Sequence, residues 1–101
     1  MEVRTGIKIS HQTAREKGFW EENDRRVKLL LIHCEISEAV EELRKDDVSA
    51  YKEELADIAI RLFDLMGYEE RRAQGTLDFE SIIKEKMAYN NNRPKKHGKK
   101  F

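Results

Sequence analysis

The stretch that decides the fold runs from Arg25 to Lys45 and reads RRVKLLLIHCEISEAVEELRK. Its apolar residues recur every three or four positions, which is the spacing of one face of an α-helix. Asn23 or Asp24 can cap the start of this helix, and Asp46-Asp47 break the pattern after Lys45. We therefore expect a helix that ends at about residue 45.

Three further helices are predicted from capping side chains at their starts and from glycine, asparagine or proline at their ends. No run of strand length alternates apolar and polar residues. The chain is therefore predicted to be one all-α domain over residues 1–101, a compact antiparallel bundle of about four helices. The three further helices are Ser10 to Lys17 before Gly18, Ser49 to Met66 before Gly67, and a helix capped by Asp78 that ends at Asn90–Asn92 and Pro94.

The composition describes a charged chain with little material for a core. Of 101 residues, 40% are charged and 39% are hydrophobic, so a lone monomer buries a modest core and a dimer or tetramer is expected. A single cysteine, Cys34, excludes an internal disulfide. The longest aliphatic run, residues 29–32, is too short for a membrane span, and MEVRTGIKIS contains no apolar signal core. We expect a cytoplasmic protein that does not enter membranes.

The formal net charge of zero hides an asymmetry. Residues 93–101 carry five basic side chains and no acid, which leaves 15 basic and 20 acidic side chains, a net charge of −5, on residues 1–92. An acidic body with a basic tail suits a protein that holds cations in one place and phosphates in another. Nucleic-acid binding is not expected, because the basic surface is narrow and has no aromatic platform beside it.

Two pairs of acids recur at one spacing, the first on a helix side that is otherwise apolar and the second at the border of an apolar stripe. Glu35 and Glu38 are three residues apart in one predicted helix, and Glu54 and Asp57 repeat this spacing in the next. If the two helices pack antiparallel, four carboxylates converge and must either take up protons or surround a divalent cation. Ligands that are all oxygen favour Mg²⁺, with Mn²⁺ as a substitute.

These acids have two other interpretations. Such pairs also arise by accident in an acidic chain, where they form solvated helix faces. A di-iron carboxylate bundle would also build a metal site from helix acids, but it uses Glu-x-x-His, and no histidine of this chain follows a glutamate at that spacing. The double occurrence on adjacent helices makes the cation site a real alternative to the solvated faces.

Three segments together resemble the MazG-like all-α nucleoside triphosphate pyrophosphohydrolases. They are LLLIHCEISEAVEELRK, EELADIAIRLFDLMG and KMAYNNNRPKKHGKKF, within residues 25–101. The family combines Glu-x-x-Glu on one helix with Glu-x-x-Asp on the next, which matches Glu35, Glu38, Glu54 and Asp57. The sequence departs from the family at Cys34, where a second glutamate often precedes the first motif.

The resemblance implies hydrolysis of a nucleoside triphosphate, ribo or deoxy, between its α and β phosphates. The products are the monophosphate and pyrophosphate, and the role implied is either removal of non-standard nucleotides or control of a nucleotide pool. Mg²⁺ would be held by the four acids, with Glu35 or Glu38 orienting the attacking water. The positions that match the family's nucleotide contacts are Lys86, Asn90 and Arg93.

Two functions from other classes compete with this prediction. One is a non-catalytic, metal-stabilised helical module that binds nucleotides or a protein. The other is an RNA- or single-strand-binding protein that uses the basic tail at residues 93–101, whose binding would weaken steeply with salt. A phosphate-binding loop of the Walker type is excluded, because the five glycines are isolated.

The remaining polar and aromatic residues have ordinary structural interpretations. The large aromatics Phe19, Trp20 and Tyr89 are expected in the core or at a subunit interface, with stacking on a base as the alternative. The lone cysteine, Cys34, lies on an apolar arc and is expected in the core. The histidines His11 and His33 are expected to be partly buried. Arg61 and Asp64 are interpreted first as a surface pair and second as outer contacts of the acids.

Overall fold

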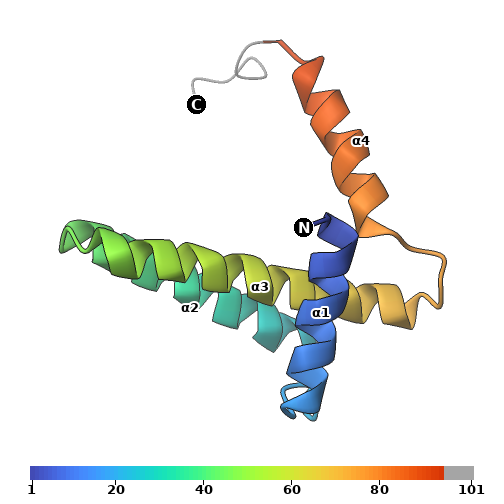
Figure 1. Cartoon of the computed structure of the whole chain (residues 1–101), viewed down its shortest axis with the longest axis horizontal. Helices are drawn as coiled ribbons and strands as arrows, with labels where there is room; N and C mark the ends of the chain where they lie inside the picture. The colour runs from blue at the N-terminus through green and yellow to red at the C-terminus, as the bar shows by residue number, and fades with distance from the viewer. Residues whose placement is uncertain (95–101) are drawn as a thin grey trace.

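Two long helices form an antiparallel hairpin at the centre of the molecule. In the computed structural model, which describes residues 1–94, these are α2 (Arg25–Arg44) and α3 (Val48–Arg72). The two lie side by side over most of their length (Figure 1). Ile32, Ala39 and Leu65 are buried in the hairpin, as the three-to-four-residue spacing predicts. The predicted second helix, with Asp24 as its cap, is confirmed.

The hairpin differs from the prediction at both ends of α3. The side chain of Asp47 caps α3 by accepting a hydrogen bond from the amide of Ala50 at 3.0 Å, so Ser49 lies inside the helix. Gly67 does not end the helix, which continues to Arg72. At Gly67 a Cβ atom would lie 2.4 Å from the Cβ of His11, so this glycine serves the close approach of α1 and not a helix end.

Helix α1 (Val3–Glu16) crosses α3 near the end that is remote from the hairpin turn (Figure 1). The prediction of a short helix starting at Ser10 was wrong, because the helix begins seven residues earlier and Ser10 is internal. Ile7, His11 and Ala14 are buried, and they follow the i, i+4, i+7 spacing of one helix face. This face packs on α3, where Gly6 and Gly67 allow the backbones to approach.

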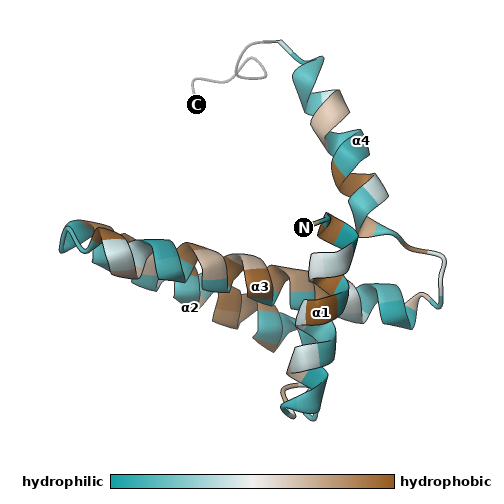
Figure 2. Ribbon diagram, in the orientation of Figure 1, coloured by the Kyte–Doolittle hydropathy of each residue, from teal (hydrophilic) through white to brown (hydrophobic). Residues whose placement is uncertain are grey.

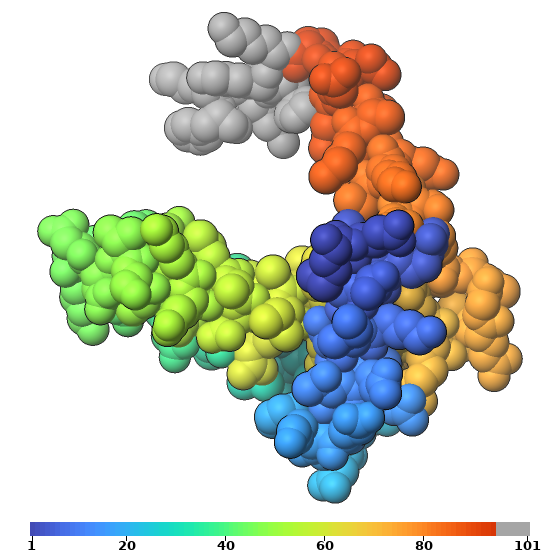
Figure 3. All heavy atoms as spheres, viewed as in Figure 1, coloured from blue at the N-terminus to red at the C-terminus, as the bar shows by residue number. Residues whose placement is uncertain are grey.

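Helix α4 (Phe79–Asn91) starts beside α1 and then stands away from the hairpin (Figures 1 and 3). Asp78 caps it, as predicted. The buried carboxylate of Glu80 in its first turn pairs with Arg4 of α1 at 3.0 Å. The radius of gyration of 15.8 Å exceeds the ~13 Å expected of a compact domain of about 100 residues. The all-α class with four helices is confirmed, but only α2 and α3 form the expected antiparallel pair.

Brown segments recur along both helices of the hairpin (Figure 2), and many of its large apolar side chains are exposed. At 100° per residue, seven of these side chains fall on the same side. Each is between 38% and 55% exposed. We call this set the apolar face: Leu29, Ile36, Val40 and Leu43 of α2, and Val48, Leu55 and Leu62 of α3.

Candidate functional site

Three of the four predicted acids gather where α2 faces α3. Glu35, Glu38 and Glu54 each place one carboxylate oxygen within 4.8 Å of the oxygens of the other two. Glu35 and Glu54 are half-buried, and Glu38 is exposed. The i, i+3 spacing sets Glu35 and Glu38 side by side on α2, and the antiparallel packing brings Glu54 of α3 against them.

Glu54 is the acid whose ionisation this arrangement disfavours. Its pKa rises from an ordinary value of 4.5 to about 7, first because its carboxyl group shares a hydrogen bond with Glu35. Loss of water and the negative charges of Glu35, Glu38 and Asp57 raise the pKa further. Its Oε2 atom is buried and finds no hydrogen-bond partner among residues 1–94. Oε2 of Glu54 is therefore an acceptor that no donor of the described residues uses.

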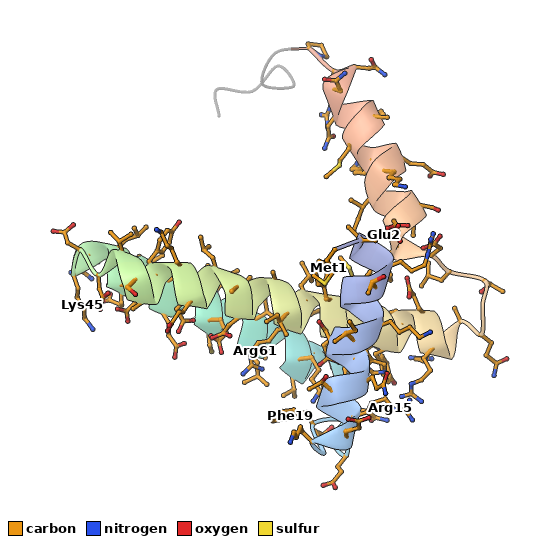
Figure 4. All side chains as sticks on the ribbon, in the orientation of Figure 1. Met1, Glu2, Arg15, Phe19, Lys45 and Arg61 are labelled. Carbon is orange, nitrogen blue, oxygen red and sulfur yellow. The ribbon has the colours of Figure 1, made fainter. Side chains whose placement is uncertain are left out.

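Arg61 compensates part of this negative charge. Its Nε donates a hydrogen bond to Oε1 of Glu35 at 3.0 Å, across the two helices. The carboxylate side chain is 16% exposed and the arginine 45%, so solvent weakens the pair but does not remove it. Figure 4 labels Arg61 in the middle of the hairpin. The interpretation of Arg61 and Asp64 as a surface pair was wrong, since Arg61 pairs with Glu35.

A cleft of about 770 Å³ opens beside the acids, between α1 and the hairpin. Asp57 does not join the group of three oxygens, but it lies on the wall of this cleft together with Glu35 and Arg61. Most of the remaining wall is apolar. It includes Ile9, Phe19, Leu31, Ile60 and Phe63, with the hydroxyl-bearing Ser10 and Thr13 of α1.

A partly buried polar network reaches the cleft through Asp64. Asp64 lines the cleft, and its Oδ1 atom accepts from Nε1 of Trp20 at 2.7 Å and contacts Nδ1 of His11 at 2.8 Å. The indole of Trp20 stacks on Tyr68 with ring centroids 4.3 Å apart. Packing of Trp20 within the core was one of its two predicted roles. No local spacing in the sequence indicates that Asp64 joins Trp20 and His11.

The predicted nucleotide contacts lie elsewhere. Lys86 and Asn90 are exposed on α4, and Arg93 follows that helix. The cations of Lys86 and Arg93 lie 5.0 Å and 5.3 Å from the centre of the Tyr89 ring. None of the three lines the cleft beside the acids. The basic residues from Lys95 onward lie outside the described residues.

Two smaller predictions were wrong. Cys34 and His33 are exposed, because both lie on the side of α2 that faces away from α3. His11, in contrast, is 5% exposed, in line with the burial expected of it. Among residues 1–94, no helix combines the length and the apolar character needed to cross a bilayer.

Comparison of the chain with protein-family models, with characterised proteins and with solved structures finds no match.

Proposed function

We propose that this protein hydrolyses a nucleoside triphosphate, ribo or deoxy, between the α and β phosphates in a Mg²⁺-dependent reaction. The observation that carries the proposal is the group formed by Glu35, Glu38 and Glu54, where a buried oxygen of Glu54 has no partner among the described residues. Three converging carboxylates fit a hard cation, which would satisfy that oxygen. The resemblance to the MazG-like pyrophosphohydrolases supports the same reaction.

The acids and Arg61 each have a role in this reaction. The three gathered acids and Asp57 would hold Mg²⁺, or Mn²⁺ as a substitute, and the ion supplies positive charge for the phosphate oxygens. Glu38 or Glu35 orients the water that attacks the α-phosphorus. Arg61 lines the cleft beside Glu35, and its guanidinium would pair with a phosphate of the substrate, to which its planar donors are suited.

We also propose that the working form is a homodimer or homotetramer. The apolar face presents Leu29, Ile36 and Leu43 at seven-residue intervals on α2, and Val48, Leu55 and Leu62 likewise on α3. Such heptads suit packing against further helices in a left-handed bundle. A second hairpin of the same sequence is the partner that matches this period.

Assembly would also account for the position of the predicted nucleotide contacts. Helix α4 stands away from the acids of its own chain, and Ile82, Met87 and Tyr89 are 41% to 65% exposed on it. Residues 33–64 carry ten acidic and four basic side chains, a formal net charge of −6, whereas Lys86 and Arg93 are cationic. In an oligomer, α4 of one copy can therefore bring Lys86, Asn90 and Arg93 to the acids of another.

The test is release of pyrophosphate from a panel of ribo- and deoxynucleoside triphosphates with Mg²⁺, with Mn²⁺ and with EDTA. We expect metal-dependent release of pyrophosphate and monophosphate, and a loss of at least about 100-fold in Glu38→Gln, since an essential acid or base contributes about that much. The helical circular dichroism of this variant should be unchanged, because Glu38 is exposed. Normal turnover in Glu38→Gln contradicts the proposal.

Glu53→Gln is the matched control, because Glu53 is an exposed glutamate next to Glu54 and lies outside the group of three. It should keep the activity of the natural protein. If Mg²⁺ raises the melting temperature while no triphosphate is cleaved, the non-catalytic metal-stabilised module explains the acids instead.

A further inference from the structure

Asp64 is a carboxylate in the cleft that the proposed hydrolysis does not use. Its Oδ1 atom is held by two neighbours, since Trp20 donates from Nε1 at 2.7 Å and His11 contacts it through Nδ1 at 2.8 Å. The Asp64 side chain is 16% exposed. Two partners on one oxygen fix the orientation of the whole carboxylate.

The hydrogen-bond chemistry of Arg71 determines which nitrogen of His11 carries the proton. The Nε of Arg71 lies 3.1 Å from Nε2 of His11, and an arginine can only donate. Nε2 must therefore be the acceptor, which places the proton on Nδ1, where it is donated to Asp64. Both contacts to Oδ1 are thus donations to a carboxylate, and Asp64 needs no proton of its own to make them.

The second oxygen of Asp64 remains available. Among residues 1–94, no donor reaches Oδ2 of Asp64. This oxygen is not fully buried, whereas Oε2 of Glu54 is. Asp64 lines the same cleft as Glu35 and Asp57. An oriented acceptor in a largely apolar cleft is well suited to select a ligand by one hydrogen bond, because a ligand without a donor leaves the acceptor unpaired.

The position of Asp64 along α3 indicates which part of a nucleotide it would meet. Asp57 and Asp64 are seven residues apart on one side of the helix, which is about two turns and roughly 10 Å. Apolar side chains of Ile60 and Phe63 line the cleft between these levels. When the phosphates of a nucleotide lie at the acids, its sugar would span the distance from Asp57 to Asp64, and its base would lie near Asp64.

We propose that Asp64 reads the nucleobase, with Oδ2 accepting a hydrogen bond from an exocyclic amino group. Cytosine, adenine and guanine carry such a group, whereas uracil and thymine have only the ring N3–H as a base donor, and it lies between two carbonyl oxygens, which the carboxylate repels. The substrates of the site are therefore triphosphates of amino-bearing bases. This inference rests on the proposed hydrolysis for the placement of the phosphates.

The experiment compares kcat/KM for CTP and UTP in the natural protein and in Asp64→Asn. The natural protein should prefer CTP by about 10- to 100-fold, as expected when the wrong substrate leaves a partly buried acceptor unpaired. In Asp64→Asn the amide oxygen still accepts from Trp20 and His11, while an NH₂ group replaces Oδ2. The preference should fall to near unity or reverse, because the amide can donate to the O4 atom of uracil.

Asp46→Asn is the control, because Asp46 lies in the turn between α2 and α3 and does not line the cleft. It should leave the CTP/UTP ratio unchanged. Equal use of CTP and UTP by the natural protein overturns the inference. So does an Asp64→Asn variant that loses activity equally on both, which indicates a structural role, or one that changes only the ratio of CTP to dCTP, which indicates contact with the sugar.

A binding measurement separates this inference from the proposed hydrolysis. Titration of cytidine and uridine, followed by amide chemical shifts, needs no turnover and no metal. Tighter binding of cytidine that Asp64→Asn abolishes supports base reading, even if no triphosphate is cleaved and the proposed hydrolysis fails. Equal binding of the two nucleosides overturns base reading, even if the enzyme is active.

Discussion

Glu54 shows how the surroundings of one residue can set its chemistry. Its carboxyl group shares a hydrogen bond with Glu35 and faces the charges of Glu38 and Asp57, and these neighbours raise its pKa to about 7. The protonated form is favoured in the folded protein but not in the unfolded chain, where the ordinary value of 4.5 applies. Stability must therefore depend on pH, and so would binding of the proposed cation.

The direction of this dependence follows from proton counting. Between pH 4.5 and pH 7 the folded state holds more protons at Glu54 than the unfolded state, so stability falls as the pH rises across this window. In EDTA, we expect the urea midpoint of the natural protein to decrease more steeply from pH 4.5 to pH 7.5 than that of Glu54→Gln. Parallel curves for the two proteins would show that Glu54 is not perturbed.

At the scale of elements, the caps determine where the helices begin. Asp24, Asp47 and Asp78 each accept a hydrogen bond from a backbone amide in the first turn of α2, α3 and α4. A side-chain acceptor satisfies a donor that the helix itself leaves without a partner. Asp47 and not Ser49 does this for α3, although serine and aspartate are both good caps, because the turn after α2 is short and the helix already begins at Val48.

Substitution of the two candidate caps distinguishes them. Asp47→Ala should destabilise the protein by about 1 kcal/mol, which corresponds to a fall of roughly 4–8 °C in Tm for a chain of this size. Ser49→Ala should change Tm by less than about 3 °C, since Ser49 is an exposed residue inside α3. Thermal unfolding followed by circular dichroism measures both, and a larger effect of Ser49→Ala would contradict the observed cap.

At the scale of the whole molecule, the four helices do not enclose one another. Only six hydrophobic residues are buried among the described part of the chain, while the seven side chains of the apolar face remain exposed. An exposed apolar stripe of this length is unusual for a monomer and typical of an interaction surface. Self-association through the hairpin would cover it.

A charge placed in this stripe tests the assembly. Ile36→Asp, near the middle of the apolar face, should shift the protein from an oligomer to a monomer in light scattering and make its Tm independent of protein concentration. Leu30→Asp is the matched control, because Leu30 is 63% exposed on the opposite side of α2 from α3. If Ile36→Asp keeps the mass of the natural protein, the apolar face is not the interface.

Much of the fold could be predicted from the sequence, because its signals are local. The spacing around Ile32 and Ala39 predicts α2, and Asp24 and Asp78 predict two helix starts, since these features depend on neighbours within a few residues. The i, i+3 spacing likewise predicts that Glu35 and Glu38 share one side of a helix. The start of α1 at Val3 was missed, because its N-cap residue, Glu2, makes no capping bond.

Only the tertiary structure decided which side chains meet across helices. It joined Arg61 to Glu35, and it joined Asp64 to His11 and Trp20. In the structure α3 also continues past Gly67, because this glycine allows the close approach of α1 and does not end the helix. The sequence by itself determined the helices and the side of each helix that is apolar. The angle and depth at which helices pack depend on all the side chains of both partners at once, and no local spacing encodes them.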